Sequence, residues 1–176
     1  MANKQALRDL QHRLAERLQA VRGQARVLSW LAVECRGHGF LLPLQEAGEI
    51  HAVPAIVPVA HAKPWFLGVA NLRGGLHGVV DLAAFLGLPA AEGGPEAGRE
   101  RSQLVALNAG LENNCALLVD RLAGLRSAAQ MTPEPDAPGQ RPPFVGDRFR
   151  DADRRLWQEL RLSELAHHPA FLRIVD

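Results

Sequence analysis

The chain has 176 residues, of which 47% are hydrophobic, enough for one ordinary domain or for two small subdomains that share a core. Its formal net charge of +1, the absence of tyrosine and an aromatic content of 5% disfavour nucleic-acid binding, which needs a basic surface and side chains that stack on bases. No window of the sequence offers the roughly 18 uninterrupted apolar residues of a membrane span, so we expect no direct membrane insertion.

The first predicted element is a helix. Apolar residues recur there at spacings of three and four, which gives one apolar stripe made of Leu7, Leu10, Leu14, Leu18 and Val21. Gly23 follows as a natural stop. We therefore expect an amphipathic helical extension over residues 1–24, whose stripe packs either on its own chain or on a partner.

The start of the chain and its cysteines indicate the compartment. The N-terminal segment is polar and charged, where a secretory signal would be apolar. Cys35 and Cys115 lie far apart and outside any paired motif, each in an apolar strand-like run. We expect a cytoplasmic protein with reduced, buried thiols.

From Val27 the pattern changes to strands. Residues 27–35 and 40–44 are apolar runs on either side of an Arg-Gly-His-Gly turn, which predicts a hairpin. Pro43 marks the second strand as an edge strand or as a strand end. Residues 45–50 then lead into residues 51–64, where three prolines exclude a regular helix and predict an irregular, extended crossing.

The segment from Trp65 to Leu88 is the most informative part of the sequence. Two β-type apolar runs flank residues 71–75, Asn-Leu-Arg-Gly-Gly, so a guanidinium is presented on a turn between largely buried strands. A short helix of about two turns is expected to follow, with Asp81 as its N-cap and Gly87 as its stop.

The second half of the chain continues the β pattern. Residues 90–98 are expected to form a surface loop, and residues 102–128 two strands joined by a tight turn around residues 110–114. The proline-dense residues 132–143 predict an extended loop without packed structure. Residues 144–160 look like a hairpin with its turn near Asp151 to Asp153, and a short helix is expected from Ser163.

Short strands at close spacing, with glycine turns and only brief helices, favour antiparallel β barrels or sandwiches over βαβ units, because there is no room for crossover helices. We therefore expect a mainly β protein.

Residues 68–82 resemble the core signature of the CheW-like family of chemotaxis adaptors, roughly G-V-x-N-L-R-G-x-h-x-P-h-h-D-L with h apolar. The matching positions are Gly68, Val69, Asn71, Leu72, Arg73, Gly74, Val79, Val80, Asp81 and Leu82. The family's proline is Gly78 here. Glu49-Ile50 and the run CALLVDRLAGLR also match family patterns.

The resemblance implies the CheW-like fold, two small five-stranded β-barrel subdomains with an N-terminal helix and short connecting helices. It divides the chain into a helical extension (1–24), a CheW-like domain of two interleaved barrels (25–165) and a C-terminal segment (166–176). Within the family the chain is most similar to PilI-type adaptors of type IV pilus (twitching motility) chemosensory systems, by its length, its leading extension and its ending HHPAFLRIVD. A flagellar adaptor would keep the core motif and would more often lack the extension.

The sequence contains no recognisable motif for catalysis, metal binding or phosphate binding. Its seven histidines show neither HExxH spacing nor a linked cysteine pair, no serine lies in a G-x-S-x-G elbow, and the glycines near Arg73 lack the remainder of a P-loop. We therefore expect no enzyme activity, cofactor or metal. The alternative is a small-molecule or metal-binding sensor that uses the groove between the barrels and the scattered histidines.

Recognition is the function that remains. Arg73 could pair with a partner's carboxylate, with Leu72 and Val69 as apolar neighbours, or it could pair internally with Asp81, Asp120 or a carbonyl. The resemblance favours the interface, because the matching arginine and glycine belong to the region of such adaptors that contacts receptor and kinase. Glu49, an exposed helix or loop acid by its pattern, matches a position near the receptor contact.

The expected protein-binding residues are Glu49, Gly68, Asn71, Leu72, Arg73 and Gly74. Gly68 most simply satisfies a backbone requirement and could also let a partner approach closely. The resemblance implies two partners, the cytoplasmic tip of a chemoreceptor and the regulatory domain of a CheA-like histidine kinase. The protein would reach the membrane only through receptor arrays.

Overall fold

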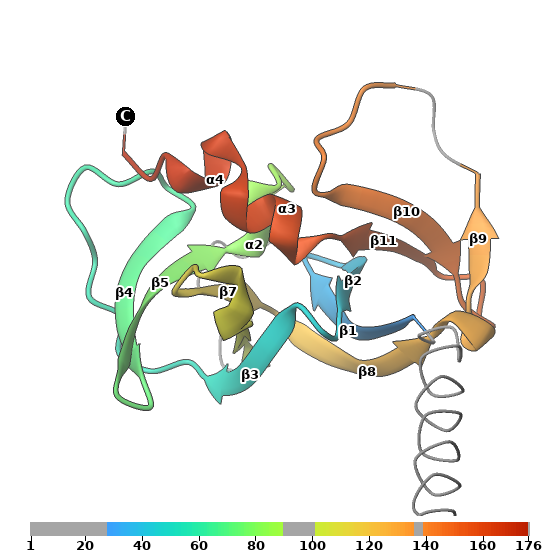
Figure 1. Cartoon of the computed structure of the whole chain (residues 1–176), viewed down its shortest axis with the longest axis horizontal. Coiled ribbons are helices and arrows are strands. Elements are labelled where there is room, and N and C mark those ends of the chain that lie inside the picture. The colour runs from blue at the N-terminus through green and yellow to red at the C-terminus, as the bar shows by residue number, and fades with distance from the viewer. Residues whose placement is uncertain (1–27, 90–100, 136–138, 176) are drawn as a thin grey trace, which may run out of the picture.

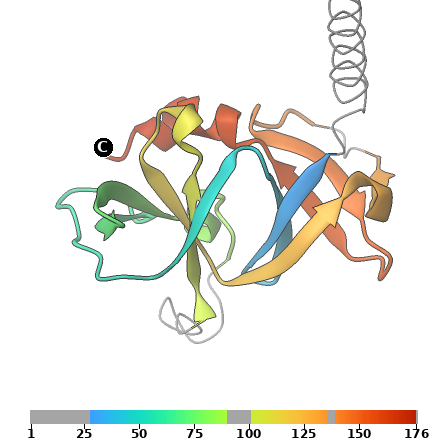
Figure 2. The same ribbon diagram turned by 60° about the horizontal axis from the view of Figure 1, so that its bottom comes forward.

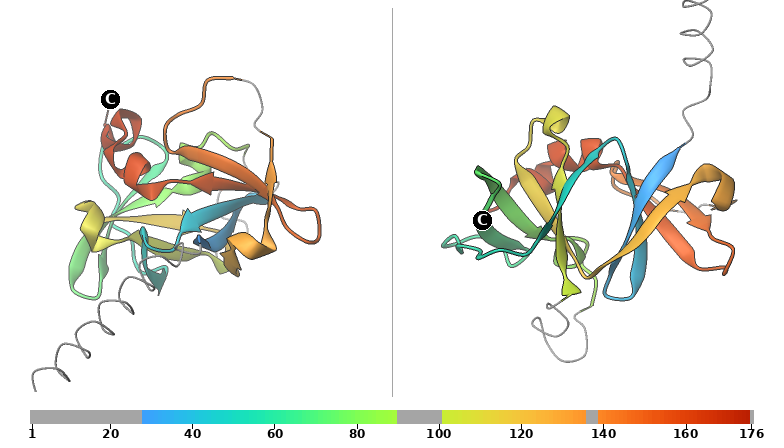
Figure 3. Two further views of the ribbon diagram at one scale, coloured as in Figure 1. Left: turned by 45° about the vertical axis from the view of Figure 1, so that its right-hand side comes forward. Right: turned by 90° about the horizontal axis from the view of Figure 1, so that it is seen from below.

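The structure is a computed structural model that describes residues 28–89, 101–135 and 139–175. The helical extension predicted for residues 1–24 and the loop predicted for residues 90–98 lie outside the described residues. Two curved sheets lie side by side, and short helices cover one side of the junction between them (Figure 1). Viewed from below, each sheet is rolled towards a barrel (Figure 3).

One sheet has six strands in the order β8-β1-β2-β11-β10-β9. Their bounds are β1 (Ser29–Cys35), β2 (His38–Pro43), β8 (Arg121–Ser127), β9 (Thr132–Glu134), β10 (Val145–Arg150) and β11 (Leu156–Leu160). All pairs are antiparallel except β2 with β11. The second strand of the described chain, β2, therefore pairs with its last strand, β11, and the chain builds the other sheet in between.

The other sheet has five strands in the order β3-β6-β7-β5-β4. Their bounds are β3 (Ala47–Ala52), β4 (Phe66–Leu72), β5 (Gly75–Asp81), β6 (Gln103–Leu107) and β7 (Cys115–Val119). The helices are α2 (Leu82–Phe85), α3 (Leu162–His167) and α4 (Pro169–Leu172), and single 3₁₀ turns occur at Ala109–Leu111 and Ala128–Gln130. The chain passes from β2 of the six-stranded sheet into β3 of this sheet, as Figure 2 shows. Within the described residues, no helix has the length and apolar character needed to cross a membrane.

The two sheets pack on one shared apolar core, which fixes their relative position. Leu31 and Val33 of β1 belong to the same buried cluster as Val105 of β6 and Leu117 of β7. The aromatic rings of Trp65, Phe85, Phe144 and Phe171 add a second connection under the helices, because neighbouring rings of this group lie 5.1 to 6.2 Å apart. Phe171 is fully packed, so the C-terminal segment is part of the shared core.

The mainly β fold in two sheets is confirmed, and so are the three hairpins β1–β2, β4–β5 and β10–β11. Pro43 ends β2, which is an interior strand, so the strand-end alternative holds. Asp81 caps α2 as expected, since its Oδ1 accepts a hydrogen bond of 2.9 Å from the amide of Ala84. The helix has one turn where about two were expected. Gly87 follows it with φ +69°, and the amide of Gly87 donates a hydrogen bond of 3.1 Å to the carbonyl of Ala84.

Two predicted segments hold more strands than expected. Residues 102–128 form three strands and not two, because the chain leaves the five-stranded sheet at Asp120 and enters the six-stranded sheet as β8. Thr132–Glu134 is the strand β9 and not loop, so this barrel has a sixth strand. Its pairing with β10 is supported by Arg150, whose Nε lies 2.6 Å from Glu134 Oε2. Pro133 is tolerated there because β9 is an edge strand.

A polar contact centred on Arg36, in the β1–β2 turn, also crosses between the sheets. The amide of Arg36 donates to Asp120 Oδ2 over 2.6 Å, and its Nη2 lies 3.4 Å from Asp81 Oδ2. Its Nη1 donates to the carbonyl of Leu88. Asp120, which lies between β7 and β8, is therefore part of the junction between the two sheets.

Replacing Arg36 with alanine should therefore weaken the junction. We expect Arg36→Ala to lower the free energy of unfolding by about 2 kcal/mol, because it removes hydrogen bonds to charged and carbonyl acceptors at a half-buried position. Urea denaturation followed by tryptophan fluorescence measures this. Arg173→Ala, at an exposed arginine, serves as the control and should change stability by less than about 0.5 kcal/mol. Equal losses in both variants would show that Arg36 does not hold the barrels together.

Both cysteines are buried and unpaired, as the sequence indicated. Burial raises the pKa of the Cys35 thiol and of the Cys115 thiol to about 12. Since only the thiolate reacts, we expect Ellman's reagent at pH 8 to modify the folded protein at least 100-fold more slowly than the urea-unfolded protein. Rapid modification of one thiol in the folded state would contradict this placement.

Candidate partner-binding site

The β4–β5 turn is a two-residue hairpin turn. Leu72 and Gly75 face each other across it, and Arg73 and Gly74 occupy its corners with φ values of +49° and +89°. Positive φ at both corners is the type I′ geometry that matches the twist of paired strands. The amide of Gly74 donates to Asn71 Oδ1 over 2.8 Å. Asn71 therefore fixes the turn, and the turn fixes the backbone from which the arginine projects.

Arg73 forms an ion pair with Glu49 on β3. Arg73 Nη1 lies 2.8 Å from Glu49 Oε2, and the two side chains are 72% and 60% exposed. His51 Nε2 lies 3.6 Å from the same oxygen. Because β3 and β4 are the opposite edges of the five-stranded sheet, this pair joins the two edges and lies on the barrel's surface.

Two expectations, one about Glu49 and one about Arg73, are corrected by the structure. Glu49 lies in a strand and not in a helix or loop, because Ala47–Ala52 pairs with β6. The internal partner of Arg73 is Glu49, whereas Asp81 and Asp120 both bond to Arg36. A surface pair of this exposure contributes at most about 1 kcal/mol to stability. Both charges therefore remain available to a binding partner at low energetic cost.

Gly68 and Leu72 occupy interior positions, unlike the other four expected residues. Gly68 has φ +135°, and a Cβ atom there would lie 2.1 Å from the carbonyl oxygen of Val57. Val57 and Val69 exchange two backbone hydrogen bonds of 2.8 Å, so the chain's own crossing segment covers Gly68. Leu72 is 5% exposed and packs inside the five-stranded barrel. These two residues support the turn from beneath, and Glu49, Asn71, Arg73 and Gly74 form its exposed surface.

Exposed apolar side chains occur on the strands that carry this site, and sequence reasoning did not select them. Leu76, 64% exposed, faces Asn71 across the hairpin, and Ile50, 41% exposed, follows Glu49 on β3. Val57, over Gly68, is exposed as well. The alternation of β5 made Leu76 recognisable as a strand residue, but only the structure shows that it faces outwards. Charge with adjacent apolar surface is the usual composition of an interface hot spot.

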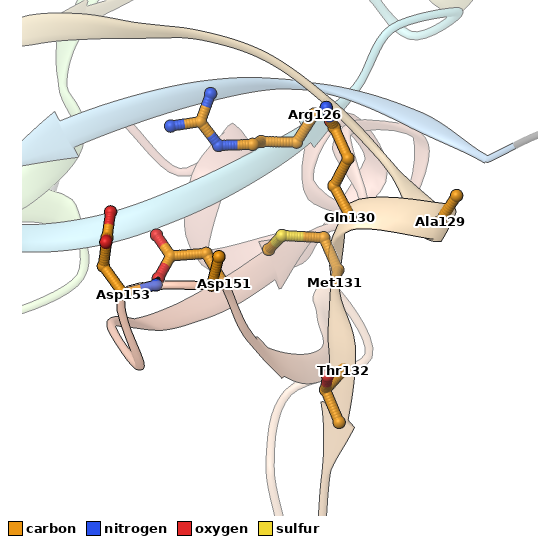
Figure 4. A pocket seen from close by; sticks show the side chains of 8 residues that line it. Arg126, Ala129, Gln130, Met131, Thr132, Asp151 and Asp153 are labelled. Carbon is orange, nitrogen blue, oxygen red and sulfur yellow. The ribbon is translucent and has the colours of Figure 1, made fainter.

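Three pockets along the six-stranded sheet have room for a small ligand. One of them, of about 530 Å³, lies at the outer end of this sheet, where Arg126, Met131, Asp151 and Asp153 are among the residues that line it (Figure 4). Asp151 already accepts a hydrogen bond of 2.8 Å from Trp157 Nε1. Burial alone would raise the pKa of Asp151, but hydrogen bonds from Trp157 and neighbouring amides outweigh it and hold the pKa below its ordinary value.

Arg126 and Asp151 therefore both have partners within the chain, since Arg126 Nη1 also donates to the carbonyl of Leu125 over 3.1 Å. The other two pockets, of about 450 and 390 Å³, are also lined mainly by the six-stranded sheet and not by both barrels. Across residues 28–89, 101–135 and 139–175, no three His, Cys, Asp or Glu side chains gather in a way that could hold a metal ion.

Comparison with known proteins agrees with this fold and motif. The model of the CheW-like domain family matches residues 29–170. Protein PilI of Pseudomonas aeruginosa is 31% identical over 158 residues, which cover 86% of this chain and 83% of PilI. The crystal structure of the scaffolding protein TtCheW from Thermoanaerobacter tengcongensis superposes with a TM-score of 0.62 at 17% identity, over 77% of this chain and 89% of that chain. At that identity the superposition shows a common fold.

Proposed function

Because the chain belongs to the family of CheW-like domains, we propose that it is a non-enzymatic adaptor that couples a chemoreceptor to a CheA-like histidine kinase. Its similarity to Protein PilI supports placing it in the bacterial signal transduction pathway that controls type IV pilus twitching motility. In this proposal the chain acts in the cytoplasm and approaches the membrane only as part of a receptor array.

One observation carries the proposal: the exposed ion pair of Arg73 and Glu49 on a rigid turn. Asn71 fixes the turn, so the guanidinium needs little further ordering when a partner binds. A partner carboxylate can bind Arg73 in a bidentate manner, and a partner cation can bind Glu49. The exchange of an internal pair for two intermolecular pairs preserves the charge balance, and the apolar Leu76 and Ile50 add contact area.

The proposed mechanism is geometric. The two barrels share an apolar core and the contacts of Arg36, so partners that bind different barrels are held in a fixed mutual position. A small movement of the receptor tip then changes the environment of the kinase's regulatory domain and shifts the kinase between two states. Coupling energies of this kind are typically about 1–3 kcal/mol, a factor of roughly 5 to 150 in the equilibrium.

In this proposal the partner contacts lie in the CheW-like domain, residues 25–165. The segments 1–24 and 166–176 flank it, and the second of them packs Phe171 into the shared core. Glu49, Asn71, Arg73 and Gly74 would contact a partner directly. Gly68 and Leu72 would contribute by shaping the β4–β5 hairpin. The division into these segments and the assignment of each surface to kinase or receptor stay predictions.

Affinity capture tests the proposal. The tagged chain is mixed with the regulatory domain of the histidine kinase and with the receptor cytoplasmic fragment encoded in the same genome. We expect each partner to be retained alone and both to be retained together. Retention of neither partner, with the chain shown to be folded by circular dichroism, would contradict the proposal.

A further inference from the structure

A groove at the start of β1 is a second candidate binding surface, separate from the Arg73 site. It has a volume of about 450 Å³ and lies between the start of β1, the end of β2 and the end of β11, where Leu28, Trp30, Pro43, Leu44, Glu159 and Arg161 line it. We call it the terminal groove.

The terminal groove has both polar and apolar lining residues, and two of its apolar side chains are open to solvent. Leu28 is 59% exposed and Leu44 is 42% exposed, which is unusual for two neighbouring leucines. The two carboxylates that line it are already bonded, because Glu159 Oε1 accepts a hydrogen bond of 2.8 Å from Trp30 Nε1 and Glu46 Oε1 accepts one of 2.8 Å from the hydroxyl of Ser163. The groove therefore favours an apolar occupant over a polar ligand.

The position of the groove along the chain indicates the occupant. Leu28, which forms one wall, is preceded by 27 residues that contain the apolar stripe from Leu7 to Val21. The seven steps from Val21 to Leu28 span at most about 25 Å when fully extended, so the stripe is tethered close to the groove. A tethered segment binds at an effective concentration in the millimolar range, which allows weak contacts to be occupied.

Charge complementarity supports the same occupant. Residues 1–27 contain six basic and two acidic residues and so carry a net charge of +4, whereas the whole chain carries +1. The remainder of the chain, residues 28–176, therefore carries a net charge of −3. Opposite net charges favour contact between the segment and the body over contact between two copies of the segment, which would repel each other.

We propose that residues 1–27 fold back on their own chain and that their apolar stripe covers the terminal groove, burying Leu28 and Leu44. The inference does not depend on the proposed adaptor function, since it concerns a different surface. It assigns an occupant to the stripe, for which the sequence alone left both the own chain and a partner open.

Disulfide trapping in the full chain tests the proposal. The variant Val21→Cys/Leu44→Cys places one thiol on the stripe and one at the groove, and the control Gln19→Cys/Leu44→Cys places the first thiol off the stripe with nearly the same tether length. The native Cys35 and Cys115 are buried and do not compete. With oxidised glutathione as the oxidant, we expect the stripe variant to form an intramolecular disulfide at least ten times faster than the control.

Two results would overturn the proposal. Equal rates in the two variants would mean that the segment is only tethered and presents no preferred face. A disulfide that links two chains, seen as a dimer on a non-reducing gel, would mean that a second copy occupies the groove.

Hydrogen exchange gives a second measurement that needs no crosslink. In the variant Leu14→Glu/Leu18→Glu the stripe is charged, and we expect the amides of residues 28–30 and 44–46 to exchange at least ten times faster than in the wild type. The control Gln5→Glu/Gln19→Glu adds the same charge away from the stripe and should leave exchange unchanged. If both variants are fully folded, unchanged amide exchange in the stripe variant would contradict docking of the stripe on the terminal groove.

Discussion

Replacing Gly68 with alanine is expected to cost about 3–5 kcal/mol of unfolding free energy, a large share of the total stability of a typical domain. The added Cβ atom would lie 2.1 Å from the carbonyl oxygen of Val57, which is backbone and cannot rotate away. The backbone at Gly68 also has φ +135°, which L-residues rarely adopt. Either the hairpin or the crossing segment must move, and the two hydrogen bonds between Val57 and Val69 would be lost.

Gly74→Ala is the matched control. Gly74 also has a positive φ, +89°, but a Cβ atom there would meet nothing within 4 Å. Its alanine variant should therefore lose only about 1–2 kcal/mol, the cost of conformational strain without a clash. Urea denaturation of both variants gives the difference directly. Equal losses would mean that the close approach of Val57 is not what requires glycine at position 68.

Reversing the charge of Arg73 is expected to have the largest effect on binding. We predict that Arg73→Glu weakens affinity for the partner that it contacts by at least tenfold, about 1.4 kcal/mol, while the free energy of unfolding changes by less than about 1 kcal/mol. The reason is that Arg73 is 72% exposed and its internal ion pair contributes little to the fold. Isothermal titration of the kinase regulatory domain and of the receptor fragment measures both affinities.

Arg154→Glu is the control for the charge change. Arg154 is also an exposed arginine with positive φ, +62°, but it lies on the β10–β11 turn of the other sheet. We expect it to retain affinity for the partner that Arg73 contacts. If Arg73→Glu binds both partners as the wild type does, Arg73 does not belong to the interface.

The double variant Glu49→Arg/Arg73→Glu separates the two roles of Arg73. It restores an internal ion pair with the charges exchanged, so the stability of the five-stranded barrel should return to the wild-type value. A partner that recognises the individual charges will still bind weakly. Recovery of full affinity would mean that the internal pair, and not the presented guanidinium, is what binding requires.

Much of the fold could be predicted from local sequence, and the exceptions have identifiable causes. Hairpins were predictable because Arg36-Gly37 and Arg73-Gly74 place glycine where the turn needs positive φ. The strand Ala47–Ala52 has no clear apolar alternation, and its pairing with β6 in the folded chain defines it. The strand Thr132–Glu134 contains proline, so its sequence signals a loop although its edge position tolerates proline.

The candidate site was predictable at the level of the turn but not of its surroundings. The motif Asn-Leu-Arg-Gly located Arg73 on a tight turn, and the structure confirms that placement. The pairing of Arg73 with Glu49 was not predictable, because it depends on curvature that brings the two edges of the sheet together. The burial of Leu72 also follows from that curvature, since the rolled sheet encloses one face of β4.

Co-sedimentation tests the central proposal, simultaneous binding of receptor and kinase, most directly. Membranes or nanodiscs that contain the cognate receptor are mixed with the histidine kinase, with and without the chain, and sedimented. We expect the kinase to sediment with the receptor much more strongly when the wild-type chain is present, and Arg73→Glu to reduce this effect. Equal sedimentation of the kinase with and without the wild-type chain would show that the chain does not couple the two partners.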